Sequence, residues 1–262
     1  MILERIVEAK REEVSTAKSR CPLPELKERI DLTPARDFIG AVRRDDLMNG
    51  IKLIAEIKKA SPSRGLIRRD FNPSQIASLF QEAGASAISV LTDERFFQGH
   101  PDFLQSVKGV VSLPLLRKDF IIDEYQIYQS RILGADAVLL IAAILGKQQL
   151  VEYIGLTKEL GMAALVEVHT ADELCRVLET EAILLGINNR NLHSFQVDLG
   201  VTDQLISAVP KERVVVSESG IRSREDVAGL AEAGVDAVLV GEALVSAQDI
   251  RAAIAELLGF CS

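Results

Sequence analysis

An acid and an amine stand at the end of the first apolar segment that could form a strand. Residues 52–57 are mostly apolar, as in a buried parallel strand, but they include Glu56, and Lys58 follows directly. Charged groups in such a place cost free energy unless they are paired or used in a reaction. A turn of small residues, Ser61-Pro62-Ser63, then ends the segment. An isolated Glu-x-Lys is most often an ordinary ion pair, so the rest of the chain must decide whether this one does chemistry.

The same arrangement recurs along the chain, because other apolar segments also end in polar or charged residues. The groups that follow them include Lys118, Glu167, Asn188, Arg190, Glu218 and Glu242. A lysine in a partly dry cavity has a lowered pKa unless a carboxylate keeps it charged. Such a lysine can act as a general acid or form a Schiff base with a carbonyl, and nearby carboxylates can act as bases. The pattern therefore predicts acid–base chemistry.

These residues have to be positioned by a regular series of strands and helices. The expected strands are 52–57, 87–91, 113–116, 137–141, 163–168, 183–187, 214–217 and 235–240. The expected helices lie near 73–83, 101–108, 123–133, 147–160, 171–179, 199–208, 223–233 and 246–258. A glycine followed by Ala-Ser-Ala, Ala-Asp-Ala or Val-Asp-Ala enters three of the strands, at Gly84, Gly134 and Gly234. This internal repeat supports the division into βα units.

Eight βα units predict an α/β fold, a (β/α)8 TIM barrel. A doubly wound open sheet is the alternative, but the chain has no G-x-G-x-x-G turn. Residues 1–48 have helical periodicity and no strand candidate, so we expect them to form an α-helical N-terminal extension. This extension should pack on a catalytic barrel of residues 49–262, so that the chain forms one domain overall. The extension could cover the barrel mouth, pack on its side or form a dimer contact.

Strand ends in a TIM barrel meet at one face, so the polar groups should share one cavity there. The last two strands offer a second feature, because Ser219-Gly220 and Gly241-Glu242 would expose backbone N–H groups where this fold commonly binds phosphate. Ser61 could add a hydroxyl, and Arg190 a fork-shaped cation. We therefore expect a phosphorylated small-molecule ligand.

The composition narrows the class of protein. The 262 residues are 48% hydrophobic and 26% charged, as in an ordinary globular protein, and the net charge of −8 argues against nucleic-acid or anionic membrane surfaces as partners. No window approaches the roughly 18 apolar residues of a membrane span, and no signal peptide is evident, so we expect a cytoplasmic enzyme. Neither the three cysteines nor the three histidines have the spacing of a metal site.

With these motifs in place, the chain resembles the indole-3-glycerol phosphate synthase family over essentially its whole length. The specific motif is Glu56-Ile-Lys-Lys-Ala-Ser-Pro-Ser63, and further motifs fall in the expected order at 116–120, 165–167, 187–190, 218–220 and 240–242. One departure is Asn191, where the family pattern has aspartate after the arginine. The resemblance implies a lyase of tryptophan biosynthesis that closes an indole ring on 1-(2-carboxyphenylamino)-1-deoxy-D-ribulose 5-phosphate, with loss of CO2 and water and without metal or organic cofactor.

The resemblance also implies roles for individual residues. The implied catalytic residues are Lys118, Glu167, Lys58, Glu56, Asn188, Glu218 and Ser219. The implied substrate-binding residues are Ser61, Pro62, Phe97, Phe120, Arg190, Gly220, Leu239, Gly241 and Glu242. A monomer or weak homodimer is expected. Two other readings remain open from the residues themselves, a lysine Schiff-base aldolase and a non-catalytic barrel that serves as a scaffold.

Overall fold

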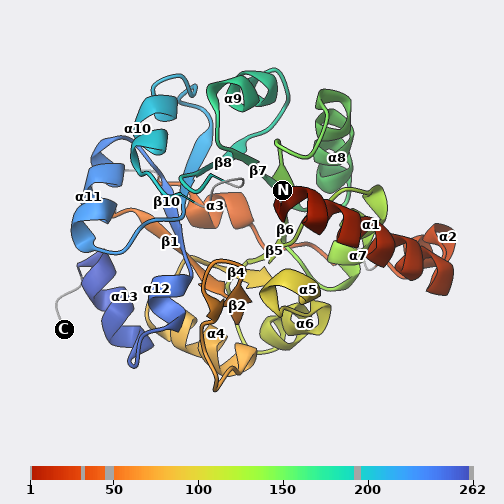
Figure 1. The fold of residues 1–262 in the computed structure, drawn as a ribbon, viewed down its shortest axis with the longest axis horizontal. Coiled ribbons are helices and arrows are strands. Elements are labelled where there is room, and N and C mark those ends of the chain that lie inside the picture. Colours follow the sequence, from red (N-terminus) through yellow and green to blue (C-terminus); the bar gives the residue numbers. More distant parts are fainter. Residues whose placement is uncertain (1, 31–32, 45–49, 192–195, 260–262) are drawn as a thin grey trace.

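A closed barrel of eight parallel strands forms the centre of the molecule (Figure 1). The computed structural model describes residues 2–30, 33–44, 50–191 and 196–259. The barrel strands are β1 (Lys52–Ile57), β4 (Ala87–Leu91), β5 (Leu115–Lys118), β6 (Ala137–Ile141), β7 (Ala163–Val168), β8 (Leu184–Asn188), β9 (Val214–Glu218) and β10 (Ala237–Val240). Pairing of β1 with both β4 and β10 closes the barrel. The predicted (β/α)8 TIM barrel is confirmed.

Helices surround the barrel in the order of the chain (Figure 1). Those that follow the strands are α4 (Pro73–Glu82), α5 (Glu94–Phe97), α6 (Pro101–Lys108), α7 (Glu124–Ile132), α8 (Lys147–Glu159), α9 (Ala171–Leu178), α10 (Gly200–Ile206), α11 (Arg224–Glu232), α12 (Glu242–Val245) and α13 (Ile250–Leu258). The side chains of Asn72, Thr170 and Ser223 cap the starts of α4, α9 and α11.

The repeated glycines lie where helices end. Gly84, Gly134 and Gly234 have φ values of +92°, +85° and +98°, and each directly follows the last capping residue of its helix. Glycine adopts this left-handed conformation without the steric cost that a Cβ atom would add. The internal repeat in the sequence is therefore a repeated helix-to-strand turn.

Several element boundaries differ from the prediction. The strand expected at 113–116 is 115–118, because Pro114 has no N–H to donate to a strand ladder. The strands expected at 183–187, 214–217 and 235–240 are 184–188, 214–218 and 237–240. The helix expected over 246–258 begins only at Ile250, where the side chain of Asp249 caps the start of α13. The prediction has no counterpart for α5, for α12 or for a small hairpin of β2 (Ala60–Ser61) with β3 (Gly65–Leu66).

The N-terminal extension contacts both ends of the barrel. It contains α1 (Ile2–Arg20), α2 (Leu23–Glu28) and α3 (Phe38–Val42). Leu3 and Ile6 of α1 pack on the barrel interior from the mouth, together with Phe120. Phe38 and Val42 of α3 fill the opposite end, where α3 is seen through the barrel in Figure 1. The predicted helical extension is confirmed, while the boundary expected between 48 and 49 lies outside the described residues.

Candidate active site

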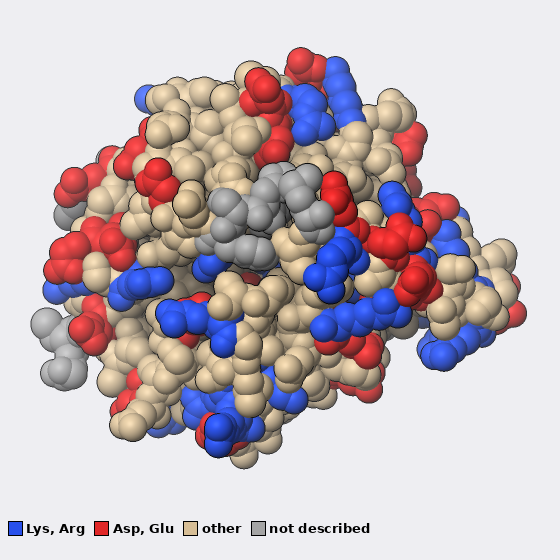
Figure 2. Space-filling view, in the orientation of Figure 1, with Lys and Arg blue, Asp and Glu red and all other residues tan. Residues whose placement is uncertain are grey.

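A cavity of about 370 Å³ opens at the carboxyl ends of the barrel strands. All the residues expected at the site line it: Glu56, Lys58, Ser61, Pro62, Phe97, Lys118, Phe120, Glu167, Asn188, Arg190, Glu218, Ser219, Gly220, Leu239, Gly241 and Glu242. On the face that Figure 2 shows, basic and acidic side chains are interspersed around a central hollow. The structure therefore brings together residues that are almost 190 positions apart in the chain.

Strand periodicity explains why these polar side chains converge. Alternate side chains of a strand point to the same face, so every second residue points into the barrel. The interior apolar core contains residues two positions before several site residues, namely Ile54, Leu116, Leu165 and Val216. The next inward positions are Glu56, Lys118, Glu167 and Glu218. Each strand thus changes from apolar to polar at its last inward residue, which places the polar layer on top of the core.

Lys118 lies among the carboxylates. Its Nζ atom is 3.2 Å from Glu167 Oε2 and 3.4 Å from Glu218 Oε2. Burial alone would lower the pKa of Lys118, but the charges of Glu218, Glu167 and Glu56 outweigh it and raise the pKa above its usual value. The condition stated from the sequence, that a carboxylate could keep a buried lysine charged, is met here. Lys118 is therefore a partly buried ammonium that can donate a proton.

Glu56 and Lys58 form the ion pair suggested by their spacing. Lys58 Nζ lies 2.7 Å from Glu56 Oε1, and both side chains line the cavity. Burial would raise the pKa of Glu56, but the charges of Lys58 and Lys118 lower it below the usual range. Glu56 is therefore an ionised carboxylate that holds Lys58 at the mouth.

Glu218 differs from Glu56, because its pKa is raised and not lowered. Burial raises its pKa to about 7, and the negative charges of Glu167 and Glu56 add to this effect against the attraction of Lys118. Lys58 pairs with Glu56, so Glu167 and Glu218 share the ammonium of Lys118 and cannot both be ionised at low cost. Glu218 is therefore the carboxyl group of the cluster that exchanges a proton near neutral pH.

Two glycines leave space for the carboxylates of Glu218 and Glu56. A Cβ atom at Gly186 would lie 2.3 Å from Glu218 Oε1, and one at Gly241 would lie 2.5 Å from Glu56 Oε1. Both distances are far below van der Waals contact. Any larger residue at either position would displace a carboxylate of the site.

Two aromatic rings and an aliphatic side chain form an apolar wall. The ring centroids of Phe97 and Phe120 lie 6.0 Å apart with the rings tilted by 35°, and Leu239 lines the same cavity. The side chain of Asp93 accepts hydrogen bonds from the N–H groups of Phe96 and Phe97, which fixes the short helix α5 that carries Phe97. The wall can hold a flat aromatic ligand beside the charged groups.

The turn after β9 has an unusual backbone. Ser219 and Gly220 have φ values of +67° and +87°, and a left-handed conformation costs a residue with a side chain, such as Ser219, roughly 1–2 kcal/mol. Consecutive residues of this kind can turn successive N–H groups toward an anion. Gly220, Gly241, Arg190 and Ser61 line the same cavity, so the groups expected to bind a phosphate share one site.

The first helix contributes residues that the sequence did not assign to the site. Ile2, Leu3 and Ile6 of α1 line the cavity. Their helical spacing showed an apolar face but not what covers it. Of the three placements left open for the extension, the start of α1 therefore lies at the barrel mouth.

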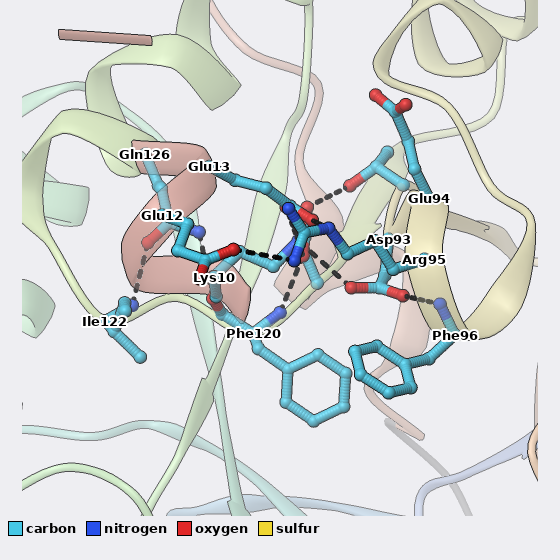
Figure 3. A network of polar contacts seen from close by, with 12 residues as sticks. Lys10, Glu12, Glu13, Asp93, Glu94, Arg95, Phe96, Phe120, Ile122 and Gln126 are labelled. Carbon is cyan, nitrogen blue, oxygen red and sulfur yellow. Dashed lines mark hydrogen bonds and ion pairs between the residues drawn. The ribbon is translucent and has the colours of Figure 1, made fainter. Parts of the chain in front are cut away.

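Lys10 fastens the same helix to the barrel (Figure 3). Its Nζ atom lies 2.9 Å from Asp119 Oδ1, 3.1 Å from Asp93 Oδ2 and 2.7 Å from Glu13 Oε2. Asp119 in turn accepts a hydrogen bond from the N–H of Phe120 and forms an ion pair with Arg117. A single buried ammonium thus connects α1 to the two loops that carry the aromatic wall.

The loop between β2 and β3 reaches the start of α12 at the cavity. Arg64, between β2 and β3, forms an ion pair with Glu242, with Nε and Oε1 2.7 Å apart. Arg64 and Ser63 line the cavity but were not predicted there. The hairpin that places them was also absent from the prediction, because strands of two residues have no recognisable periodicity.

The described residues contain no group of three or more His, Cys, Asp or Glu side chains arranged for a metal ion. His100 caps α6, and His169 Nδ1 lies 2.7 Å from the carbonyl oxygen of Asn188, whereas His193 is outside the described residues. Cys21 and Cys175 are free thiols, and Cys261 is not described. None of the described helices has the length and apolar character needed to span a membrane.

Fold and site together define a TIM-barrel enzyme with a lysine–carboxylate site at the carboxyl ends of its strands. Comparison with solved structures supports the fold: 3-hexulose-6-phosphate synthase from Salmonella typhimurium matches 80% of this chain and 97% of its own, with a TM-score of 0.65 at 15% identity. The tryptophan synthase complex of Pyrococcus furiosus contains a chain that matches 80% of this one and 98% of its own, with a TM-score of 0.59 at 15% identity.

Sequence comparison identifies the family. The model of the indole-3-glycerol phosphate synthase family matches residues 3–257. Relatives named indole-3-glycerol phosphate synthase include one from Dehalococcoides mccartyi (strain CBDB1), 51% identical over 98% of this chain and 100% of its own, and one from Legionella pneumophila (strain Paris), 49% identical over 98% of both. The chain belongs to this family. It is therefore a carbon–carbon lyase of tryptophan biosynthesis that acts on a phosphorylated small molecule.

Proposed function

We propose that the cavity binds 1-(2-carboxyphenylamino)-1-deoxy-D-ribulose 5-phosphate and converts it to indole-3-glycerol phosphate, CO2 and water through the lysine–carboxylate cluster. The observation that carries these assignments is the position of Lys118, a partly buried ammonium between Glu167 and Glu218. Ring closure requires a proton for the ribulose carbonyl oxygen as the ring carbon attacks. Lys118 supplies that proton.

The remaining steps use the other charged groups. Lys58 neutralises the carboxylate of the substrate, which then leaves as CO2 and restores the aromatic ring. Loss of water requires an acid for the departing hydroxyl and a base for a proton of the former ribulose chain. We assign these roles to Lys58 and Glu167. Glu56 and Asn188 orient the amine and hydroxyl groups, and Glu218 and Ser219 line the aniline and ribulose portion.

Binding divides between the two sides of the cavity. Phe97, Phe120 and Leu239 hold the aromatic ring. The phosphate is held by Ser61, Arg190 and the backbone N–H groups of Gly220, Gly241 and Glu242, and Pro62, directly after Ser61, shapes the mouth there. An apolar wall facing fixed donors suits a ligand with an aromatic ring at one end and a phosphate at the other.

The electrostatics favour this function over a Schiff-base aldolase. A Schiff base needs a neutral amine, but the neighbouring carboxylates raise the pKa of Lys118 and keep it protonated. A non-catalytic scaffold barrel would have no use for this cluster of charged groups, because removing charges from water costs free energy even when they are paired.

The test is formation of indole fluorescence from the carboxyphenylamino-ribulose phosphate, in a chain with no tryptophan to obscure the signal. We expect Lys118→Ala to lower kcat by about 10³-fold or more while the substrate still binds. Lys108→Ala is the matched control, because Lys108 pairs with Asp136, whose carboxylate also binds the N–H of Leu115 at the start of β5. Turnover near wild type in Lys118→Ala would reject its role, and borohydride trapping of a lysine adduct would favour the aldolase.

We further propose that residues 1–48 and 49–262 act as one catalytic unit, because α1 contributes to the cavity wall. We place the enzyme in the cytoplasm, as a monomer or weak homodimer that needs no metal or organic cofactor. Sedimentation at several concentrations tests the oligomeric state. Full activity in the presence of a metal chelator tests the absence of a metal requirement.

A further inference from the structure

Asn189 lies between two residues of the candidate site, but its own side chain is not part of the cavity lining. Its neighbours Asn188 and Arg190 line the cavity. Asn189 is instead 1% exposed and points toward the turn that follows β9. Nothing in the proposed reaction uses it.

The amide nitrogen of Asn189 is directed at that turn. Nδ2 lies 2.9 Å from Ser217 Oγ, 3.0 Å from the carbonyl oxygen of Glu218 and 3.1 Å from that of Ser219. On the other side, Oδ1 accepts hydrogen bonds from the N–H and the hydroxyl of Thr202, at 3.2 and 2.8 Å. Thr202 therefore orients the amide so that its donors face β9.

The two carbonyl groups flank the residue with the left-handed backbone. Ser219 has a φ of +67°, and the peptide units before and after it carry the carbonyls that Asn189 holds. In a trans peptide unit the N–H points opposite to the C=O. No described peptide bond is cis, so fixing the Ser219 carbonyl toward Asn189 fixes the Gly220 N–H away from Asn189. The same relation holds for the Glu218 carbonyl and the Ser219 N–H.

We propose that Asn189 is a positioning residue that holds the Glu218–Gly220 turn in its left-handed conformation and thereby aims the N–H group of Gly220 at the phosphate of the substrate. This inference rests on the proposed function, in which Gly220 binds that phosphate. It adds a residue that touches no substrate atom but sets the geometry of the groups that do.

The test measures phosphate recognition separately from stability. Asn189→Asp keeps the shape and an acceptor for Thr202 but removes the side-chain donors to Ser217 Oγ and to the carbonyls of Glu218 and Ser219. The backbone N–H of Asn189 still binds the Glu218 carbonyl, so the Ser219 carbonyl is the one set free. We expect it to raise the KM for the substrate about tenfold, and to raise the inhibition constant of inorganic phosphate by the same factor. Gln126→Glu is the matched control, because Gln126 is another buried amide that donates to a loop carbonyl, that of Phe120. It should leave the inhibition constant of phosphate unchanged.

A double-mutant cycle separates positioning from a general structural role. Ser219→Gly removes the steric cost of the left-handed backbone, so Asn189→Asp should change the phosphate constant less in that background than in the wild type. Equal changes in both backgrounds would overturn the proposal. So would a lower melting temperature with an unchanged phosphate constant.

A second variant covers the case in which Asn189→Asp does not fold. Thr202→Val removes one of the two hydrogen bonds that orient the amide, and we expect it to raise both constants two- to threefold. Unchanged constants would count against the proposal. If inorganic phosphate does not compete with substrate in the wild type, the proposed phosphate site is wrong, and this inference is wrong with it. If phosphate competes equally well in the wild type and in Asn189→Asp, only this inference is overturned.

Discussion

Glu218 Oε2 lies 3.4 Å from the ammonium of Lys118, while its other oxygen, Oε1, is buried without a hydrogen-bond partner among the described residues. One oxygen of this carboxyl group thus faces a cation, while the other has no donor to stabilise a negative charge. Burial raises its pKa to about 7 for this reason. The relationship makes Glu218 sensitive to pH in the range in which the enzyme would work.

Stability should fall with rising pH because of this group. The folded chain keeps a proton on Glu218 up to about pH 7, whereas an unfolded glutamate releases it near pH 4.3. The folded state therefore binds more protons between these values, and the free energy of unfolding decreases as the pH rises through this interval. We expect Glu218→Gln to show a shallower decrease between pH 5 and 8, measured by urea unfolding. Glu225→Gln, at an exposed acid, should keep the wild-type slope, and equal slopes for all three chains would contradict the assignment.

Gly186→Ala should impair catalysis although it removes no functional group of the site. The added methyl group would lie 2.3 Å from Glu218 Oε1, so the carboxylate has to move. We expect kcat/KM to fall at least tenfold and stability to fall by about 1–3 kcal/mol, as for other overpacked cores. The control is Gly155→Ala in α8, which has open space and should gain about 0.5–1 kcal/mol with activity retained. Steady-state kinetics and thermal unfolding check both, and normal turnover in Gly186→Ala would show that Glu218 does not depend on this space.

Lys10→Met should cost far more stability than the loss of another ion pair on the same helix. It leaves Asp93 and Asp119 buried with one cation fewer, and uncompensated buried charges cost about 3 kcal/mol or more. Lys18→Met removes a pair with Asp123 that is part exposed, which is worth at most about 1 kcal/mol. Urea unfolding of both variants measures the difference. Similar losses would mean that the buried network does not fasten α1 to the barrel.

Phe97→Leu should weaken substrate binding more than turnover. The ring of Phe97 faces Phe120 across 6.0 Å and offers a flat wall, which leucine cannot replace. We expect the KM to rise about threefold to tenfold with a smaller change in kcat. Phe103→Leu disrupts a similar ring pair, with Phe71 at 5.6 Å, away from the cavity lining and should leave the KM unchanged. A rise in KM for both variants would point to a general packing effect instead.

Local periodicity was sufficient to predict most of the fold. Strands β1, β4, β6 and β7 lie at the predicted residues, because a buried parallel strand is a short apolar segment between turns. The boundaries that moved did so for local reasons, such as Pro114 before β5 and the Asp249 cap before α13. The small hairpin β2–β3 was missed because two residues are too few to show a period.

The sequence by itself determined which side chains stand at the strand ends and on which face of each strand they lie, because chemical identity and a period of two are properties of the chain alone. Only the tertiary structure decided that Lys118 is charged, that Lys10 joins Asp93 to Asp119 and that Asn189 holds the turn at Ser219. Each of these depends on distances between residues from different strands or helices. Closure of the barrel creates those distances, and burial makes the resulting charge interactions strong enough to set the pKa values of the site.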